Sequence, residues 1–248
     1  MLSYLLLLLF IWGFVIEPEL LSVKRYKTDF LNGKRIVFVS DWHIGKFDRP
    51  RLRRIIKKIN ALEPDIVLSG GDFIKGHSGK CSMPVDEQAK ELAKINAPII
   101  TVLGNHDIIY DKFTVKNTLE KYGITVLDNS CIKVGDFSIA GVGNKTVLPS
   151  EIATALEQAE DKKILISHTP DIYYDVKEDV DLILAGHVHG GQVRVPFYGA
   201  LLVPSKYGNK FACGDFTETQ NRMIVTKGLG TSILGVRFND IPEIVVLE

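Results

Sequence analysis

Five short apolar runs alternate with helical patterns along this chain, and this alternation limits the possible folds more than any other feature. The runs lie within the stretches KRIVFVSDWH, PDIVLSGGD, APIITVLGNHD, KKILISHTPD and DLILAGHVHGG. Helical patterns follow the first three runs, over residues 50–62, 86–96 and 112–123. Strands that alternate with helices predict a layered α/β architecture, in which ligands gather at the carboxyl ends of the strands.

Each of the five runs ends in side chains that can bind a metal ion. Asp41 and His43 lie two positions apart, so an extended backbone points both to the same side. Five of the six histidines of the chain occur at these ends, and only His77 does not. Ordinary buried histidines would not explain the accompanying carboxylates. The metal-capable residues at the run ends are Asp41, His43, Asp72, Asn105, His106, Asp107, His168, His187 and His189.

The last run closes with a pair of glycines directly after its two histidines. We interpret His187 and His189 as ligands rather than as buried core residues. Gly190 and Gly191 would then let the backbone turn sharply without side chains that crowd the site.

The set Asp-x-His, Gly-Asp, Gly-Asn-His-Asp, His and Gly-His-x-His occurs in this order, and it resembles the calcineurin-like metallophosphoesterases. The resemblance covers the chain from about Arg35 to its end. It implies an α/β fold, a four-layer α-β-β-α sandwich in which helices flank two facing β-sheets. The stretches CIKVGDFSIAGVG, RMIVTKGLG and PEIVVLE would supply further strands.

The same resemblance implies two metal ions with distinct ligands. One ion would be held by Asp41, His43 and His189, the other by Asn105, His168 and His187, with Asp72 bridging the two. Many members of the family read Gly-Asp-x-x-Asp at the second motif, whereas GDFIKG places Lys75 at its last position. The bridging ligand is the first aspartate of that motif, so this departure leaves the expected ligand set intact. We interpret Lys75 and His77 as loop residues.

The donor types indicate the metal and its chemistry. Oxygen and imidazole donors without thiolates suit Mn, Fe, Zn or Mg, and we expect two divalent cations, with Mn²⁺ favoured. Such a pair stabilises phosphoryl oxygens during in-line attack. By resemblance, His106 would stabilise charge or protonate the leaving oxygen, and Asp107 would orient it. Alternatively, Asp107 is a loop carboxylate that binds backbone N–H groups.

Basic side chains are concentrated in one part of the chain, although the formal net charge is zero. Residues 24–58 contain 12 Lys or Arg and three Asp, a local charge of 12 − 3 = +9, so the remainder carries −9. Such an asymmetry favours a surface that faces an anionic partner such as lipid, and an ordinary solvated face is the alternative. The basic side chains of the helix expected over 50–62 are Arg51, Arg53, Arg54, Lys57 and Lys58.

Residues 1–16, MLSYLLLLLFIWGFVI, contain no charged side chain. As a helix they reach about 24 Å, short of the roughly 30 Å hydrocarbon core, so a span is marginal and a shallow insertion is the alternative. A buried core helix is the third interpretation. We divide the chain into a hydrophobic membrane anchor (1–23), a basic juxtamembrane linker (24–34) and a metallophosphoesterase domain (35–248). If the anchor spans, the basic residues after it predict a catalytic domain on the cytoplasmic face.

Within the superfamily, the chain looks most like the membrane-associated branch that includes UDP-2,3-diacylglucosamine pyrophosphatases of lipid A synthesis. The similarity lies in the apolar N-terminus and in GHVHGGQVRVP, YGALLVPSKYGNKFACG and GLGTSILGVRF. It implies a hydrolase that cleaves a phosphodiester or phosphoanhydride of a lipid-linked substrate at the membrane surface. The residues that could contact this substrate are Gln192, Arg194, Lys206 and Tyr207.

Two other functions fit the sequence. An anchored phosphodiesterase or phosphatase could act on a soluble nucleotide or another phosphorylated substrate. A metal-free interaction module on the same fold is the second, and the intact ligand set argues against it. No specific nucleic-acid partner is expected, and the sequence leaves the oligomeric state open.

Overall fold

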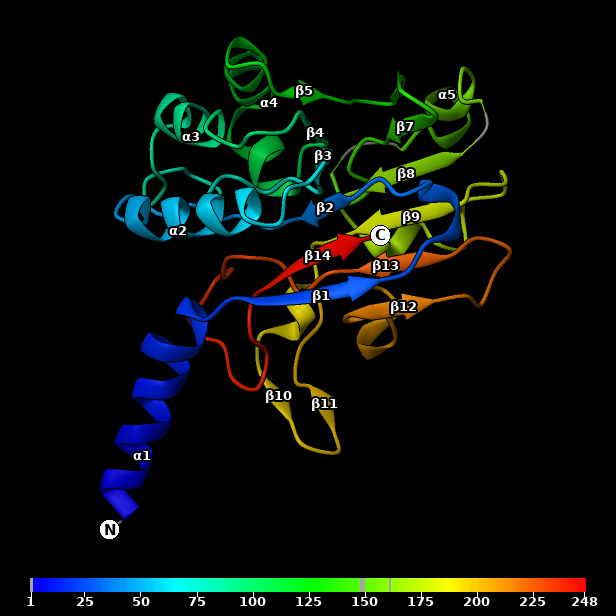
Figure 1. Cartoon of the computed structure of the whole chain (residues 1–248). Helices are drawn as coiled ribbons and strands as arrows, with labels where there is room; N and C mark the ends of the chain where they lie inside the picture. Colours follow the sequence, from blue (N-terminus) through cyan, green and yellow to red (C-terminus); the bar gives the residue numbers. More distant parts are fainter. Residues whose placement is uncertain (1, 148–149, 161) are drawn as a thin grey trace.

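Two β-sheets form the body of the chain in the computed structural model, which describes residues 2–147, 150–160 and 162–248 (Figure 1). Within these residues each sheet has six strands. In order across the first sheet they are β1 (Ser22–Tyr26), β14 (Glu243–Leu247), β2 (Ile36–Val39), β3 (Ile66–Ser69), β4 (Ile99–Thr101) and β5 (Thr125–Val126). Across the second they are β12 (Gly214–Phe216), β13 (Met223–Val225), β9 (Leu182–Ala185), β8 (Lys163–Ser167), β7 (Phe137–Gly141) and β6 (Ser130–Val134).

Strand β2 shows how the sheets pack. All four of its residues are buried, and they alternate between two cores. Val37 and Val39 belong to the core on the helical side, whereas Ile36 and Phe38 belong to the core between the sheets. A strand covered on both faces needs apolar residues at every position, which explains the unbroken apolar run.

Helices cover the outer faces of both sheets, as the sequence predicted for two facing sheets flanked by helices. The first sheet is covered by α2 (Arg49–Asn60), α3 (Val85–Leu92) and α4 (Asn105–Lys121). The second carries a thinner layer, formed by the short α5 (Ile152–Leu156) and by residues around Tyr173 and Phe211. Single turns of 3-10 helix lie at η3 (Asp29–Leu31), η4 (Pro170–Ile172), η5 (His189–Gly191) and η6 (Gly208–Phe211).

Parallel pairing places the ligand-bearing loops together. Strands β2, β3, β4 and β5 run parallel in the first sheet, and β7, β8, β9 and β13 run parallel in the second. The loops after β2, β3 and β4 therefore leave one edge, where they meet the loops after β8 and β9. The further strands expected from the sequence are present as β6, β7, β13 and β14.

The sequence predicted a linker over residues 24–34, and this prediction is wrong. Strand β1 pairs in parallel with β14, with Ser22 opposite Glu243 and Tyr26 opposite Leu247, so the folded body begins about 13 residues before Arg35. The preceding turn is also attached, because Glu17 is buried and its carboxylate accepts a hydrogen bond from the backbone N–H of Asp240. The charged stretch SVKRY resembles a linker in sequence, yet an edge strand needs few apolar residues.

The N-terminal apolar residues form a helix that extends away from the body (Figure 1). Helix α1 (Leu2–Ile11) continues into one turn of π-helix, η1 (Trp12–Ile16), and one of 3-10 helix, η2 (Glu17–Glu19). Residues 3–10 are exposed on every side, so the core-helix interpretation is wrong. Among the described residues, no helix combines the length and apolar character needed to cross a membrane. Met1 lies outside the described residues.

The basic excess of residues 24–58 is largely paired with acidic residues from elsewhere in the chain. Arg53 of α2 binds Glu91 of α3 with an Nη2–Oε1 distance of 2.8 Å, and Arg54 binds Glu19 at 2.5 Å. Other pairs join Arg25 and Arg35 to Glu248, Arg49 to Glu87, and Lys34 to Asp65. The arginines of this segment are therefore held in ion pairs within the fold, but the six of them share four carboxylates, so part of the basic excess remains.

Candidate metal centre

Seven side chains that the sequence predicted as metal ligands meet where the two sheets' strand ends face each other. Asp41 and His43 follow β2, Asp72 follows β3, and Asn105 follows β4 as the first residue of α4. His168 follows β8, and His187 and His189 follow β9. Within the described residues, three sets of side chains have ligand atoms close enough to share an ion. Two match the sequence prediction: Asp41, His43 and His189, and Asp72, His168 and His187. The third consists of His43, Asp72 and His106.

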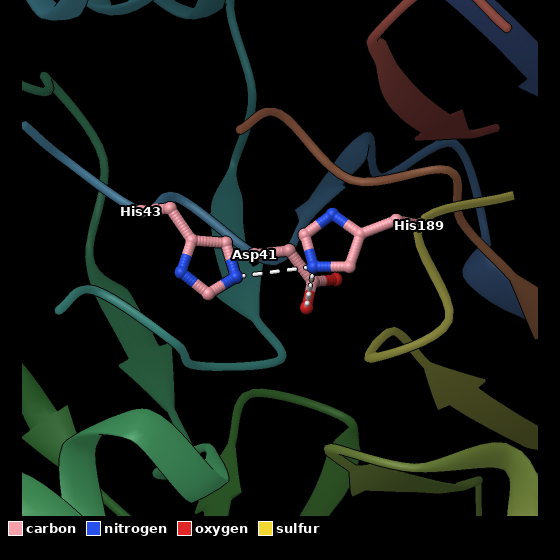
Figure 2. Close-up of side chains that lie close together, drawn as sticks. All are labelled: Asp41, His43 and His189. Carbon is pink, nitrogen blue, oxygen red and sulfur yellow. Dashed lines mark hydrogen bonds and ion pairs between the residues drawn. The ribbon is translucent and has the colours of Figure 1, made fainter. Parts of the chain in front are cut away.

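The first set joins the two sheets (Figure 2). The Nε2 atoms of His43 and His189 lie 3.1 Å apart, and His189 Nε2 lies 3.5 Å from Asp41 Oδ1. Two neutral imidazoles that aim lone pairs at each other repel, unless one carries a proton or a cation lies between them. A cation about 2.1 Å from each nitrogen spans an edge of roughly this length, so the set fits a metal ion.

The second set has the same kind of geometry. His168 Nε2 lies 3.1 Å from His187 Nδ1 and 3.0 Å from Asn105 Oδ1. The Asp72 carboxylate lies between the sets, with Oδ2 3.4 Å from His168 Nε2 and 3.5 Å from His43 Nε2. This position fits the bridging role that the family resemblance implied for Asp72.

The electrostatics of the centre favour cations. Burial lowers the pKa of His43 and of His187 to about 4, so both rings are neutral and their nitrogens can bind a metal. Burial also acts to lower the pKa of His168, but the nearby Asp72 carboxylate overrides it and raises that pKa to about 9. The Asp72 carboxylate thus favours positive charge at this position, which a divalent cation would supply.

Backbone carbonyls orient two of the ligand rings. His43 Nδ1 donates to the carbonyl of Ile74 at 3.0 Å, and His168 Nδ1 donates to the carbonyl of Gly70 at 2.7 Å. Each bond fixes the tautomer in which Nε2 carries the lone pair, as is usual for histidines that bind metals.

The backbone at the centre is strained. Positive φ angles are rare for residues other than glycine. They occur here at Asp41 (55°), His43 (39°), Asp72 (56°), His187 (71°) and His189 (52°). Each such backbone conformation costs about 1–3 kcal/mol of free energy, and it persists only where the surrounding structure enforces it. Five of the seven expected ligands therefore sit in conformations that a fold without a site would avoid.

Two glycines make room for the carboxylates. A side chain at Gly104 would place its Cβ 1.9 Å from Asp72 Oδ1, which is impossible without movement of the bridging residue. Gly190 has a φ of +64°, and a Cβ there would meet Asp240 Oδ2 at 2.4 Å. The sharp turn predicted for the paired glycines is therefore confirmed, and its cause is close packing as well as backbone conformation.

His106 lies at the mouth of the centre. Its ring centroid is 4.6 Å from that of His43, and its backbone N–H donates to Asp72 Oδ1 at 2.9 Å. Its Nε2 is 3.4 Å from the hydroxyl oxygen of Ser232. His77, interpreted as a loop residue, packs against His106 with the ring planes tilted by 46° and the centroids 4.4 Å apart, and it lines the same pocket. His77 thus lies in a loop, as expected, but this loop after β3 folds back so that its side chain also borders the site.

Asp107 supports the backbone of the ligand loops. Its carboxylate accepts hydrogen bonds of 2.8 to 3.0 Å from the N–H groups of Asp72, Phe73, Ile74 and Gly104. Burial raises the pKa of Asp107 to about 7, while these four donors favour the ionised form. The contacts match the alternative given for this residue, a carboxylate that binds backbone N–H groups, rather than the orientation of His106.

A largely apolar pocket of about 410 Å³ opens from the metal centre. Asp72, Asn105, His106 and the two histidines after β9 form its polar end. Its walls come from the segment after η5 and from residues 232–236, and their apolar members are Val188, Val193, Leu201, Leu202, Pro204, Ile233, Leu234 and Val236. The volume is in the range of sites that bind small molecules.

Of the residues expected to contact substrate, Gln192 alone lines this pocket, and the loop residue Lys75 lies outside it. Gln192 lines the pocket, but its amide binds the backbone of Ser232 and Leu234. Arg194 donates to the carbonyl of Gly190 at 2.9 Å and is not among the pocket-lining residues. Lys206 pairs with Asp175, Tyr207 packs among aromatic rings, and Lys75 lies near Asp48, so none of these three reaches the pocket.

Two facing sheets with paired aspartate and histidine sets at their strand ends define a metal-dependent phosphoester hydrolase. The family model for calcineurin-like phosphoesterases matches residues 34–191, more than half of the chain. The chain therefore belongs to the calcineurin-like phosphoesterase family, which confirms the resemblance seen in its motifs.

Similar proteins agree with this assignment. The chain is 31% identical to the uncharacterized metallophosphoesterase YkuE of Bacillus subtilis, over 93% of this chain and 86% of that protein. It is 29% identical to the phosphodiesterase YaeI of Escherichia coli, over 94% and 89%. The solved structure of Haemophilus influenzae NAD nucleotidase covers 79% of this chain and 45% of its own, at 20% identity and a TM-score of 0.52. This last likeness shows the fold alone.

Proposed function

We propose that this chain is a binuclear phosphodiesterase or phosphoanhydride hydrolase whose substrate carries an apolar, lipid-like group beside the reacting phosphate. The observation that carries the proposal is the apolar pocket, because it opens directly from the metal ligands. A phosphate at the ligands would leave its organic substituent against the pocket wall. UDP-2,3-diacylglucosamine has this chemistry and is one candidate substrate.

The chain's own residues divide the work of hydrolysis. Two divalent cations bound by the seven ligands would supply Lewis-acid stabilisation of the phosphoryl oxygens. His106 Nε2 faces the pocket beside Ser232, where it can give a proton to the leaving oxygen. Asp107 keeps the loops after β3 and β4 in register, which fixes Asp72 against His106.

The pocket would select substrates through burial of apolar surface. Each methylene removed from water contributes about 0.8 kcal/mol. Two to four methylenes bound along Leu202, Leu234 and Val236 would therefore raise kcat/KM by roughly 10- to 200-fold. A nucleotide without such a group would gain nothing from these walls.

A matched pair of substrates tests the proposal. Octyl p-nitrophenyl phosphate and methyl p-nitrophenyl phosphate share the phosphodiester and leaving group and differ only in the alkyl chain. With both dissolved as monomers and Mn²⁺ present, we expect a kcat/KM about 10-fold or more higher for the octyl ester. Equal values for the two would contradict the proposal and favour a soluble nucleotide or other polar substrate.

A pair of variants locates the effect in the pocket. Val193→Phe adds volume to the pocket wall, and it should remove most of the octyl preference while hydrolysis of the methyl ester continues. Val195→Phe makes the same change two positions away, where the side chain does not line the pocket, and it should keep the preference. UDP-2,3-diacylglucosamine and UDP-glucose, assayed side by side, then test the natural substrate class.

A further inference from the structure

Three uncharged segments, far apart in sequence, meet at the end of the molecule where the pocket opens. They are residues 2–16, residues 195–205 and residues 228–236, and none contains Asp, Glu, Lys, Arg or His. The middle segment includes the turn of the hairpin formed by β10 (Arg194–Val195) and β11 (Gly199–Ala200). In Figure 1 the helix and the hairpin both project from the lower side of the body.

Backbone contacts join the three segments. The N–H of Arg237 donates to the carbonyl of Gly13 at 2.9 Å, which attaches the helical segment to the third segment. The N–H of Phe238 donates to the carbonyl of Gln192 at 2.8 Å, which attaches the third segment to the hairpin. The pocket lies between hairpin and third segment, since Leu202 and Leu234 both line it. We call the exposed apolar side chains of the three segments the apolar rim.

The apolar rim exposes large side chains to an unusual extent. Phe197 and Ile233 are 111% and 94% exposed, and Leu202 is 73% exposed. Helix α1 adds a run of exposed leucines whose members surround the helix, so it has no polar face. Contiguous apolar surface of this kind on a soluble body marks a site of interaction with another apolar surface.

Backbone strain holds two of these side chains outward. Phe197 has a φ of 67° and Ile233 a φ of 60°. A positive φ is a genuine outlier for a β-branched or bulky residue, and Gly or Asn would adopt it more easily. An aromatic and an aliphatic side chain are thus kept at strained turn positions where water gives them no stabilisation.

A lipid bilayer fits the apolar rim better than a protein partner does. A helix that docks in a protein groove has one apolar face and one polar face, whereas α1 is apolar all round. Protein interfaces also carry a polar rim with charged residues, and all three segments lack charge. A helix inserted in the hydrocarbon of a bilayer needs neither a polar face nor charged residues, and apolar side chains on all its sides are stabilised there.

We propose that the apolar rim docks the enzyme on a bilayer by inserting α1, the hairpin turn and Ile233, so that the pocket mouth opens onto the lipid. This inference deepens the proposed function and rests on it for the substrate's path, since a lipid could then pass its phosphate to the metal centre without leaving the membrane. Because the rim is uncharged, docking depends on apolar burial and not on anionic lipid.

Binding of the full-length protein to phosphatidylcholine vesicles tests the docking. Co-sedimentation should give the same partition coefficient at low and high salt and with or without anionic lipid. Phe197→Ser should lower the coefficient about 5-fold, and Phe197→Ser/Tyr198→Ser about 10-fold or more. Phe113→Ser is the matched control, since Phe113 is 73% exposed on α4, at the opposite end of the molecule, and this variant should bind like the original.

Hydrolysis separates the docking from the proposed function. Neither Phe197 nor Tyr198 lines the pocket, so the double variant should cleave monomeric octyl p-nitrophenyl phosphate at the original rate and vesicle-bound lipid more slowly. Unchanged vesicle binding by the double variant would overturn the docking, whatever the octyl assay shows. A requirement for anionic lipid, or a rim that instead forms a salt-stable dimer in light scattering, would overturn it too. If the original enzyme shows no preference for the octyl ester, but its binding to vesicles still depends on the apolar rim, only the proposed function would be overturned.

Discussion

The metal centre and the apolar rim are opposite kinds of region. Five of the seven expected ligands are buried, and carbonyls, backbone N–H groups and neighbouring rings orient the set. The rim consists of side chains that point into solvent from a helix, a hairpin turn and a loop. Yet both regions hold non-glycine residues at positive φ, at Asp72 and His187 in the one and at Phe197 and Ile233 in the other.

This comparison shows two ways in which a fold can be prepared for a partner. At the centre, the strain places donor atoms where a cation relieves their mutual repulsion, and the fold alone enforces the geometry. At the rim, the strain holds apolar side chains outward, where only a second apolar surface stabilises them. Substitutions at the centre should therefore lower the rate of hydrolysis, and substitutions at the apolar rim should lower binding to the bilayer.

The largest effect should come from the residue between the two ligand sets. Asp72→Asn removes the negative charge that faces both His43 and His168, so we expect a loss of at least about 10³-fold in kcat and of bound metal. Metal analysis and hydrolysis of methyl p-nitrophenyl phosphate measure both. Asp136→Asn, an exposed carboxylate at another surface, serves as the control. An Asp72→Asn enzyme with normal metal content and rate would break the account of the centre.

The His106→Ala variant should retain its metal ions but hydrolyse its substrate more slowly. Because His106 lies beside the ligand sets and faces the pocket, we expect kcat to fall by roughly 10²–10⁴-fold while KM changes little. A substrate with a good leaving group, which needs less protonation, should lose less than one with a poor leaving group. Normal turnover of the poor-leaving-group ester would show that His106 has no acid role.

Arg237 lies at the joint between the two regions and sharpens the comparison. Its buried guanidinium donates to the carbonyls of Lys227 and Gly230, and burial lowers its pKa to about 10. Arg237→Met leaves these carbonyls without their donor and removes one of the two cations that pair with Asp240, so we expect the free energy of unfolding to fall by about 3–5 kcal/mol. Arg222→Met breaks a partly exposed pair with Asp215 and should cost less than about 1 kcal/mol. Similar losses in the two urea titrations would contradict this role of Arg237.

The smallest effect concerns the ion pairs on the basic face of α2. Hydrogen bonds from Arg53, and then from Lys94, outweigh the burial of Glu91 and lower its pKa from 4.5 to about 2. The folded pKa lies below the unfolded one, so this stabilisation is present above about pH 4.5 and is lost as the pH falls toward 2. Arg53 is 56% exposed, so Glu91→Gln should cost only roughly 1–2 kcal/mol at neutral pH. The difference in stability between Glu91→Gln and the original protein should shrink as the pH falls from 4.5 toward 2, and a constant difference would contradict the pairing.

The ligands could be predicted from the sequence because each directly follows a buried parallel strand. The run IVFV predicts a strand covered on both faces. The residues that follow a parallel strand lie at the carboxyl ends of the strands, where ligands bind. The sequence therefore predicts Asp41 and His43 as candidate ligands. Their separation of 146 residues from His187 and His189 mattered little, because parallel strands of facing sheets bring their ends together.

Other features depended on contacts that no local pattern encodes. Strand β1 pairs with residues about 220 positions away, and its charged sequence gave no strand signal. His77 reaches His106 only because the loop after β3 folds back, and Asp107 binds N–H groups about 35 residues away. The basic face of α2 looked free because Glu91 and Glu19 lie on other elements. The single β-branched residue of β1, Val23, is too little to predict a strand.

The most direct test of the central claim is the metal content of fully active protein, measured by mass spectrometry together with kcat. Seven ligands arranged in two sets around Asp72 should bind two divalent cations per chain, and activity should return in proportion to occupancy when a chelated sample is titrated with Mn²⁺. Full activity with at most one ion per chain would contradict the binuclear centre.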